Sequence, residues 1–172
     1  MVMTLDELRK RCEVRLAGLT LPRPFDIDAF SRGLAAQRGR EIVLEPVANV
    51  AGPHGLWLAR HNADFVFYQQ HTSPAHRDHI ILHELCHLLC DHQVKLGQGL
   101  PHERLLPDLL PETVQRMLSR ATYSDDQERE AELLASLILE RSRGLQVAPV
   151  EPPNGSEALV QRLAATFGNE DA

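Results

Sequence analysis

Long apolar runs are absent from this sequence, and no stretch approaches the roughly 20 apolar residues that a membrane-spanning helix needs. We expect no secretion signal, because Met1–Glu13 is charged and amphipathic. Positive charge is in deficit: the formal net charge of -6 argues against a general affinity for nucleic acid or anionic lipid. We therefore expect neither a membrane location nor strong general nucleic-acid binding.

Cysteine is scarce, and its three positions do not form a disulfide framework. The number of cysteines is odd and their spacing is irregular, with Cys12, Cys86 and Cys90 as the three positions. This pattern indicates a reducing compartment. Internal repeats and low-complexity segments are absent as well. The sequence therefore predicts a cytoplasmic location.

The chain has the size and composition of one globular domain. Its 172 residues are 43% hydrophobic and 24% charged, which are ordinary values for a protein with a buried core. We expect a single domain over residues 1–172, with its core at about 26–143. A C-terminal helix at 156–167 is expected after the Pro-rich spacer 147–155.

Capping residues and apolar spacing predict an α+β fold. Helices are predicted at residues 4–17, from Asp26 to near Gly39, from Ser73 to about His92, at 111–118 and at 124–141. Strands are predicted at 41–47, 55–59 and 65–69, joined by turns as a three-stranded meander. Residues 93–110 have the Gly and Pro content of a loop or lid. The small sheet is expected to pack on the third helix and on the helix at 124–141.

A His-Glu-Leu-Cys-His motif at residues 83–87 organises the chain. Helical residues four apart lie roughly 40° apart around the axis and about 6 Å along it, so His83 and His87 can reach one zinc ion. Glu84 falls roughly 100° round from His83, beside the metal, where a carboxylate can act on water as a general base. The alternative is an amphipathic helix with two incidental histidines.

The helix around this motif has two faces of different character. Ser73 and Pro74 predict its start, as N-cap and first-turn residues. The apolar side chains gather on the side away from the histidines, at Ile81, Leu82, Leu85, Leu88 and Leu89. The pattern predicts one face for the core and one for a polar cleft. Cys90 follows the histidine stripe and is interpreted as a small buried residue, with a thiolate on the metal as the alternative.

A third protein ligand is expected for a catalytic zinc ion, and two nearby schemes fail. The metzincin pattern needs a histidine six residues after His87, where Gln93 stands and His92 is one residue out of place. Asp91 lies too far along an unbroken helix, so it is expected to orient a histidine or to lie in solvent.

The later helix supplies the carboxylate in the third scheme. Glu128, Glu132 and Ala135 share one helical stripe, flanked by Ala131, and these small residues would allow a close approach to the histidine helix. The stripe favours Glu128 as the ligand, with Glu132 and Glu130 as alternatives. A solvated acidic first turn is the competing interpretation.

The paired segments resemble the ImmA/IrrE family of bacterial and phage zinc metallopeptidases, over about residues 40–142. The residues that carry the resemblance are Phe65-Val66-Phe67-Tyr68, Ser73-Pro74, the motif at 83–89, and Glu128-Arg129-Glu130-Ala131-Glu132 with Ala135 and Leu139. Cys86 stands where the family commonly has Gly, and Glu132 where it often has Asn or Asp. The resemblance implies a gluzincin-like metallopeptidase that cleaves a helix-turn-helix repressor and so switches on stress, phage or mobile-element genes.

The expected enzyme is therefore a zinc endopeptidase with His83, His87 and Glu128 as metal ligands and Glu84 as general base. Tyr123 is a candidate to stabilise the oxyanion, and otherwise a packed residue. The strand before the histidine helix could bind extended substrate along an exposed edge, or only support the helix. The competing function is a zinc-containing binding protein that inactivates its partner by docking alone, as an anti-repressor or toxin–antitoxin component does.

Overall fold

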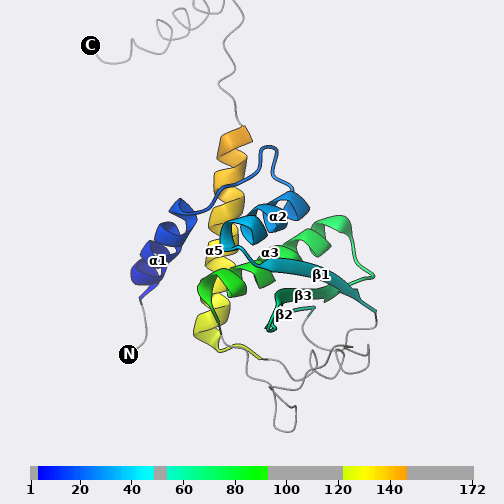
Figure 1. The fold of residues 1–172 in the computed structure, drawn as a ribbon. Coiled ribbons are helices and arrows are strands. Elements are labelled where there is room, and N and C mark those ends of the chain that lie inside the picture. Colours follow the sequence, from blue (N-terminus) through cyan, green and yellow to red (C-terminus); the bar gives the residue numbers. More distant parts are fainter. Residues whose placement is uncertain (1–3, 49–53, 93–121, 147–172) are drawn as a thin grey trace, which may run out of the picture.

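The computed structural model describes residues 4–48, 54–92 and 122–146, which form an α+β fold (Figure 1). Four helices lie within these ranges: α1 (Leu5–Ala17), α2 (Ile27–Arg38), α3 (Pro74–Cys90) and α5 (Asp125–Gln146). One three-stranded sheet accompanies them, built from β1 (Glu41–Val47), β2 (Gly55–Ala59) and β3 (Ala63–Gln69). The α+β class predicted from the sequence is confirmed. The loop, spacer and helices predicted at 93–110, 111–118, 147–155 and 156–167 lie outside the described residues.

The predicted helix starts are confirmed by hydrogen bonds between side chains and backbone. Thr4 and Glu7 form a capping box at α1, and Ser124 and Gln127 exchange the corresponding pair of hydrogen bonds before α5. Asp26 caps α2 and Ser73 caps α3 through single backbone N–H groups. Capping is local chemistry, so these boundaries follow from the sequence alone.

The predicted meander is wrong, although the positions of the strands agree closely with the sequence. The strand order is β1-β3-β2, with β1 parallel to β3 and β2 antiparallel to it. The central strand is therefore β3, whose run Phe65-Val66-Phe67-Tyr68 suits a strand with neighbours on both sides.

A buried ion-pair cluster explains why β1 starts beside the start of β3. Asp64 is 1% exposed and pairs with Nε of Arg40, the residue before β1, at 2.9 Å. Arg38 lies at 3.5 Å from the same carboxylate, and Nε1 of Trp57 on β2 donates to it at 3.2 Å. Arg40 also donates to the Arg60 and Ala63 carbonyl oxygens at the turn between β2 and β3. These contacts fix the parallel register, which no spacing of turn residues could reveal.

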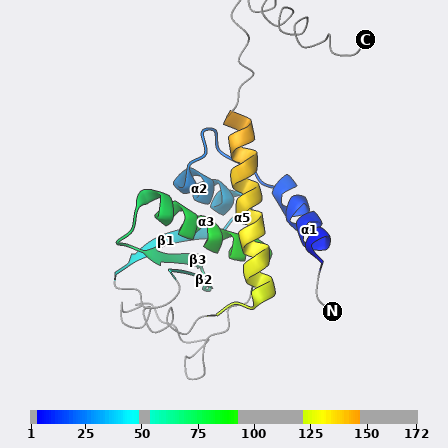
Figure 2. The same ribbon diagram turned by 180° about the vertical axis from the view of Figure 1, so that it is seen from behind.

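Two helices, α2 and α3, contact the sheet directly, and α5 and α1 follow at increasing distance from it. α2 contacts β1, and α3 contacts β2 and β3. α5 packs against α3, and α1 packs against α5. Figures 1 and 2, viewed from opposite sides, both show α1 on the side of α5 that faces away from the sheet. α3 is thus in contact with the sheet, with α2 and with α5.

One cluster of buried apolar side chains joins these elements. It includes Cys12 and Leu16 of α1, so that the N-terminal helix belongs to the same core as α3 and α5. The other members come from the segment between α1 and α2, from α2, β2, β3, α3 and α5, among them Leu21, Phe30, Trp57, Val66, Ile81, Leu82, Leu85, Leu88, Leu134 and Ile138. Of the helices within the described ranges, none combines the length and apolar character needed to cross a membrane.

Replacing Asp64 with Asn should destabilise the fold by about 1.5–3 kcal/mol, the usual contribution of hydrogen bonds to charged groups. The substitution keeps the shape of the side chain but removes the charge that pairs with Arg40 and Arg38. Urea unfolding measures the difference. The matched control is Asp78→Asn, whose ion pair with Arg77 is partly exposed and should contribute less than about 1 kcal/mol. Equal losses in the two variants would contradict a structural role for the buried cluster.

Candidate metal centre

Helix α3 carries the histidine motif, and its second half is buried on nearly every side. His87 is 0% and Glu84 is 4% exposed, whereas the side chain of His83 is 20% exposed. Of the two motif histidines, His83 thus lies on the open polar face that the sequence predicts, whereas His87 is buried. The ring of Tyr123, which precedes α5, stacks on His87.

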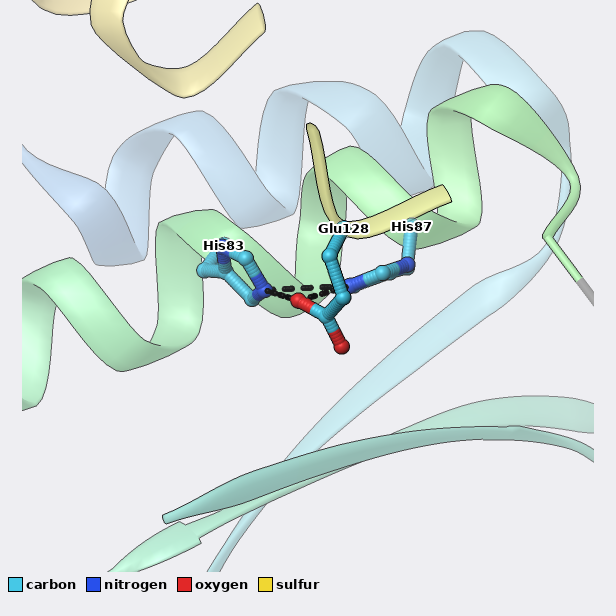
Figure 3. A group of neighbouring side chains, drawn as sticks. All are labelled: His83, His87 and Glu128. Carbon is cyan, nitrogen blue, oxygen red and sulfur yellow. Dashed lines mark hydrogen bonds and ion pairs between the residues drawn. The ribbon is translucent and has the colours of Figure 1, made fainter. Parts of the chain in front are cut away.

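Three side chains from α3 and α5 converge on one point, as Figure 3 shows. Nε2 of His83 lies 3.0 Å from Nε2 of His87 and 3.1 Å from Oε2 of Glu128. The third edge, between Nε2 of His87 and Oε2 of Glu128, measures 3.7 Å. Zinc–ligand bonds of about 2.0–2.1 Å at tetrahedral angles place neighbouring ligand atoms roughly 3.3 Å apart. These three residues, which we call the donor triangle, could therefore hold a metal ion.

The neighbouring carboxylates on α5 take different positions. Oε2 of Glu132 lies 3.5 Å from Nδ1 of His83, the nitrogen that faces away from the donor triangle. Glu130 is buried and contacts His92 instead. Asp91 is exposed and ends α3 in the left-handed conformation, with φ 53°. Among the acidic residues proposed from the sequence, the structure thus brings Glu128 together with both histidines.

Sequence reasoning missed His92 as a neighbour of the site. His92 lies just beyond α3, where the left-handed turn at Asp91 returns the chain, so that its Nδ1 lies 2.9 Å from Nδ1 of His87. Its Nε2 lies 3.3 Å from Oε2 of Glu130. Together with Cys90, these two residues form a second group with ligand atoms close enough to hold an ion. Spacing excluded His92 only as a ligand of the first site, and no local sequence signal showed its contact with His87.

The structure favours the buried-residue interpretation of Cys90. It lies with His92 and Glu130 rather than in the donor triangle. Burial raises the pKa of its thiol to about 12, so that the group stays protonated at neutral pH. Burial likewise raises the pKa of Cys86. Neither sulfur has the character of a reactive thiolate.

His87 is held in the state that binds metals. Burial lowers its pKa to about 3, with further lowering from His83 and His92. Its imidazole is therefore neutral at physiological pH, with a lone pair available on one nitrogen. The burial that removes His87 from solvent thus also keeps protons from competing for it.

Glu84 lies beside the donor triangle and is oriented by the sheet. The backbone N–H of Trp57 on β2 donates to its Oε2 at 2.9 Å. Gly55 allows this approach, because a Cβ there would lie 2.8 Å from Oε1 of Glu84. Burial raises the pKa of Glu84 to about 8, with the Trp57 hydrogen bond opposing the shift and the charge of Glu128 adding to it. A pKa near neutrality suits a group that both accepts and donates protons.

Tyr123 precedes α5 and contacts the same site. Its ring stacks on His87, with centroids 3.6 Å apart and planes 11° from parallel. Its hydroxyl oxygen is buried without a hydrogen-bond partner among the described residues. Burial raises its pKa, so that the hydroxyl remains a hydrogen-bond donor.

A cleft of about 330 Å³ opens beside these groups. It is lined by His54, Gly55, Leu56, His76, His79, Ile80, His83, Glu84, Tyr123, Glu128 and Glu132. Two donor-triangle residues, the Glu84 carboxyl and the residues at the start of β2 therefore share one cleft. Such convergence of polar groups is typical of a binding or catalytic site.

Comparisons of the chain with protein-family models, with curated proteins and with solved structures found no match. Function is therefore inferred from the chemistry of the site itself.

In chelator-treated protein, the Glu84 carboxyl should make the fold less stable as the pH rises. Its folded pKa of about 8 exceeds the usual value of 4.5, so the folded state keeps a proton that the unfolded chain loses between these values. The free energy of unfolding should fall by up to about 1.4 kcal/mol per pH unit across this interval. Urea unfolding of wild type and Glu84→Gln between pH 6.5 and 8 measures the effect.

The chosen interval separates Glu84 from His87. Because the pKa of His87 is lowered to about 3 from 6.5, its contribution rises with pH mostly below 6.5 and levels off above it. Glu84→Gln should therefore abolish most of the pH dependence above that value. An identical slope in the two proteins would contradict the raised pKa.

Proposed function

We propose that the protein is a zinc-dependent endopeptidase of the ImmA/IrrE type, with His83, His87 and Glu128 as metal ligands and Glu84 as general base. The donor triangle carries the proposal: two imidazole nitrogens and one carboxylate oxygen stand 3.0–3.7 Å apart. Two of its residues, His83 and Glu128, line one cleft together with Glu84. Two histidines and one glutamate are a known ligand set of catalytic zinc, which leaves a position for water or substrate.

The metal supplies the part of the chemistry that side chains cannot. A zinc ion held by the donor triangle would polarise a peptide carbonyl and make a water molecule more acidic. Glu84 does not belong to the donor triangle, and its raised pKa lets it accept a proton from water. It then gives this proton to the leaving amine. Tyr123 keeps its hydroxyl proton and is our candidate donor to the oxyanion.

The sheet offers a place for the substrate backbone. β2 lies at the edge of the described sheet, and its residues Gly55 and Leu56 line the cleft. An extended peptide could pair with this edge in the manner of strand addition. The N–H of Trp57 is already occupied by Glu84, so pairing must use the other backbone groups of β2.

A helix-turn-helix repressor is the substrate we propose, and this part rests on the resemblance of the two motif segments to the ImmA/IrrE family. Cleavage of such a repressor would switch on stress, phage or mobile-element genes. The alternative is inactivation of the repressor by docking alone. The position of Glu84 favours the enzyme, since a purely structural zinc ion has no use for a buried carboxyl with a pKa near neutrality.

The purified protein should carry about one zinc ion per chain, since one zinc fills the donor triangle. His83→Ala and His87→Ala should abolish binding, and Glu128→Gln should weaken it by more than about 100-fold, beyond the usual loss from an outer partner. Glu84→Gln should retain the metal. Elemental analysis and competition with a chelator measure these differences.

Glu132→Gln is the matched control, because Glu132 lies on the same helix one turn further on and touches only the outer nitrogen of His83. Its zinc affinity should fall much less than that of Glu128→Gln. Equal loss of zinc from the Glu84, Glu128 and Glu132 variants would contradict the assigned ligands.

Glu84→Gln should separate the enzyme from the docking protein. The substitution is nearly isosteric, so fold, zinc content and partner affinity should survive, while cleavage falls by about 10²–10⁴-fold. The measurement is derepression of the partner's target promoter in cells, beside a blot for intact or shortened repressor. We expect loss of derepression with uncut repressor. Full derepression by the variant, with the repressor intact, would reject the peptidase in favour of docking.

A further inference from the structure

We propose that His92 and Glu130 are positioning residues for His87, which hold its imidazole in the orientation and tautomer that metal binding at Nε2 requires. This role presupposes the metal site of the proposed function and adds the residues that support one of its ligands. Neither residue belongs to the donor triangle, so both act through His87.

A continuous chain of contacts runs from His87 to Glu130. Nδ1 of His87 lies 2.9 Å from Nδ1 of His92, and Nε2 of His92 lies 3.3 Å from Oε2 of Glu130. The three residues are 0%, 6% and 4% exposed. Buried polar atoms need partners inside the protein, so this pairing is a requirement of the fold as well as of the site.

The proton positions along this chain follow from a metal bound at one end. His87 faces the donor triangle with Nε2, so its neutral imidazole carries the proton on Nδ1. The Nδ1–H of His87 then donates a hydrogen bond to Nδ1 of His92. Because Nδ1 of His92 is the acceptor, neutral His92 carries its own proton on Nε2. The Nε2–H then donates to the Glu130 carboxylate. Conversely, Glu130 selects the tautomer of His92, and His92 selects the metal-binding tautomer of His87.

Helix α1 anchors the far end of the chain. Oε1 of Glu130 lies 3.1 Å from a guanidinium nitrogen of Arg11 and 3.6 Å from Nε of Arg15. Arg15 also donates to the Leu89 carbonyl oxygen near the end of α3, at 2.9 Å. Two guanidinium groups complement the negative charge of the carboxylate as ion pairs, while Oε1 itself accepts no hydrogen bond among the described residues. The N-terminal helix thereby contributes to the support of His87.

The same geometry argues against a second metal ion at Cys90, His92 and Glu130. A metal on Nε2 of His92 would move the proton of His92 to Nδ1, where it would donate to His87. His87 would then carry its own proton on Nε2, the nitrogen that the donor triangle needs. Arg11 and Arg15 also oppose a further cation beside Glu130. The two groups therefore exclude each other when both histidines are neutral.

His83 provides the internal comparison. Its Nδ1 faces Glu132, at the longer distance of 3.5 Å, and the side chain of Glu132 is 56% exposed. Water can replace such an exposed partner, whereas nothing replaces a buried one. Removing Glu130 should therefore matter more than removing Glu132, although Glu132 contacts a ligand directly and Glu130 does not.

Zinc affinity, measured by competition with a chelator, tests this positioning role. His92→Leu removes the acceptor at similar volume and should weaken zinc about 10–100-fold, the usual loss when an outer partner of a metal ligand is removed. Glu130→Gln should weaken zinc in the same direction. His92→Gln, whose amide oxygen can still accept from His87, should restore part of the loss. Glu132→Gln and Cys90→Ala, the matched controls, should leave the affinity nearly unchanged.

Imidazole nitrogen NMR of the zinc-loaded, ¹⁵N-histidine-labelled protein gives a readout that does not depend on activity. We expect His87 as the Nδ1–H form and His92 as the Nε2–H form. His92 found as the Nδ1–H form would overturn the proposal. So would a second zinc ion per chain that Cys90→Ala removes. Urea unfolding of the chelator-treated variants shows whether each variant is folded. If folded His92→Leu and folded His92→Gln lose zinc affinity to the same extent, the proposal is also overturned.

These measurements separate the positioning role from the peptidase. Zinc bound with the expected tautomers in a protein that cleaves nothing would support the role of His92 and Glu130 while contradicting the proposed function. Cleavage by wild type, with zinc affinity unchanged in His92→Leu and Glu130→Gln, would overturn the role and leave the peptidase standing.

Discussion

The close approach of α5 to α3 is the constraint on which the whole site depends. Ala131 and Ala135, on the face of α5 near Glu128, are 0% and 1% exposed, and larger side chains there would hold the helices apart. With this spacing Glu128 reaches Nε2 of His83 at 3.1 Å. Tyr123, just before α5, stacks on His87, which is 0% exposed. The N-terminal end of α5 and the residue before it therefore provide both a carboxylate for the donor triangle and a cover for His87.

Burial of polar groups then dictates most of the remaining contacts. A buried imidazole or carboxyl without a partner is costly, and each of those at the site has one from a different part of the chain. Glu84 takes the N–H of Trp57 from the sheet, and His87 takes His92 from the residues after α3. Glu130 is paired with α1 through Arg11. A cluster of four titratable groups is thus held by contacts that also join the sheet, α1, α3 and α5 into one core.

The features predicted correctly from the sequence are those that depend on neighbouring residues. Helix starts follow from caps such as Ser73, and the meeting of His83 with His87 follows from helical geometry. The small residues Ala131 and Ala135 also indicated the correct face of α5. The parallel pairing of β1 was missed because it depends on the ion pair between Arg40 and Asp64. These residues lie at the starts of β1 and β3 and are 24 positions apart in the sequence. His92 was missed for a similar reason: a left-handed turn at Asp91, not helical spacing, brings it back to His87.

The sheet contributes to the proposed chemistry as well as to the support of α3. Burial alone would hold Glu84 protonated, and a protonated carboxyl cannot serve as a base. The Trp57 N–H stabilises the carboxylate form and so opposes burial, leaving the pKa of Glu84 at about 8. At that value both protonation states are accessible near neutral pH, as a group that first accepts and then donates a proton requires. β2 can make this contact because Gly55 has no side chain to separate it from Glu84. A backbone group on an edge strand, with a glycine beside it, thereby adjusts the acid–base behaviour of a residue on the helix.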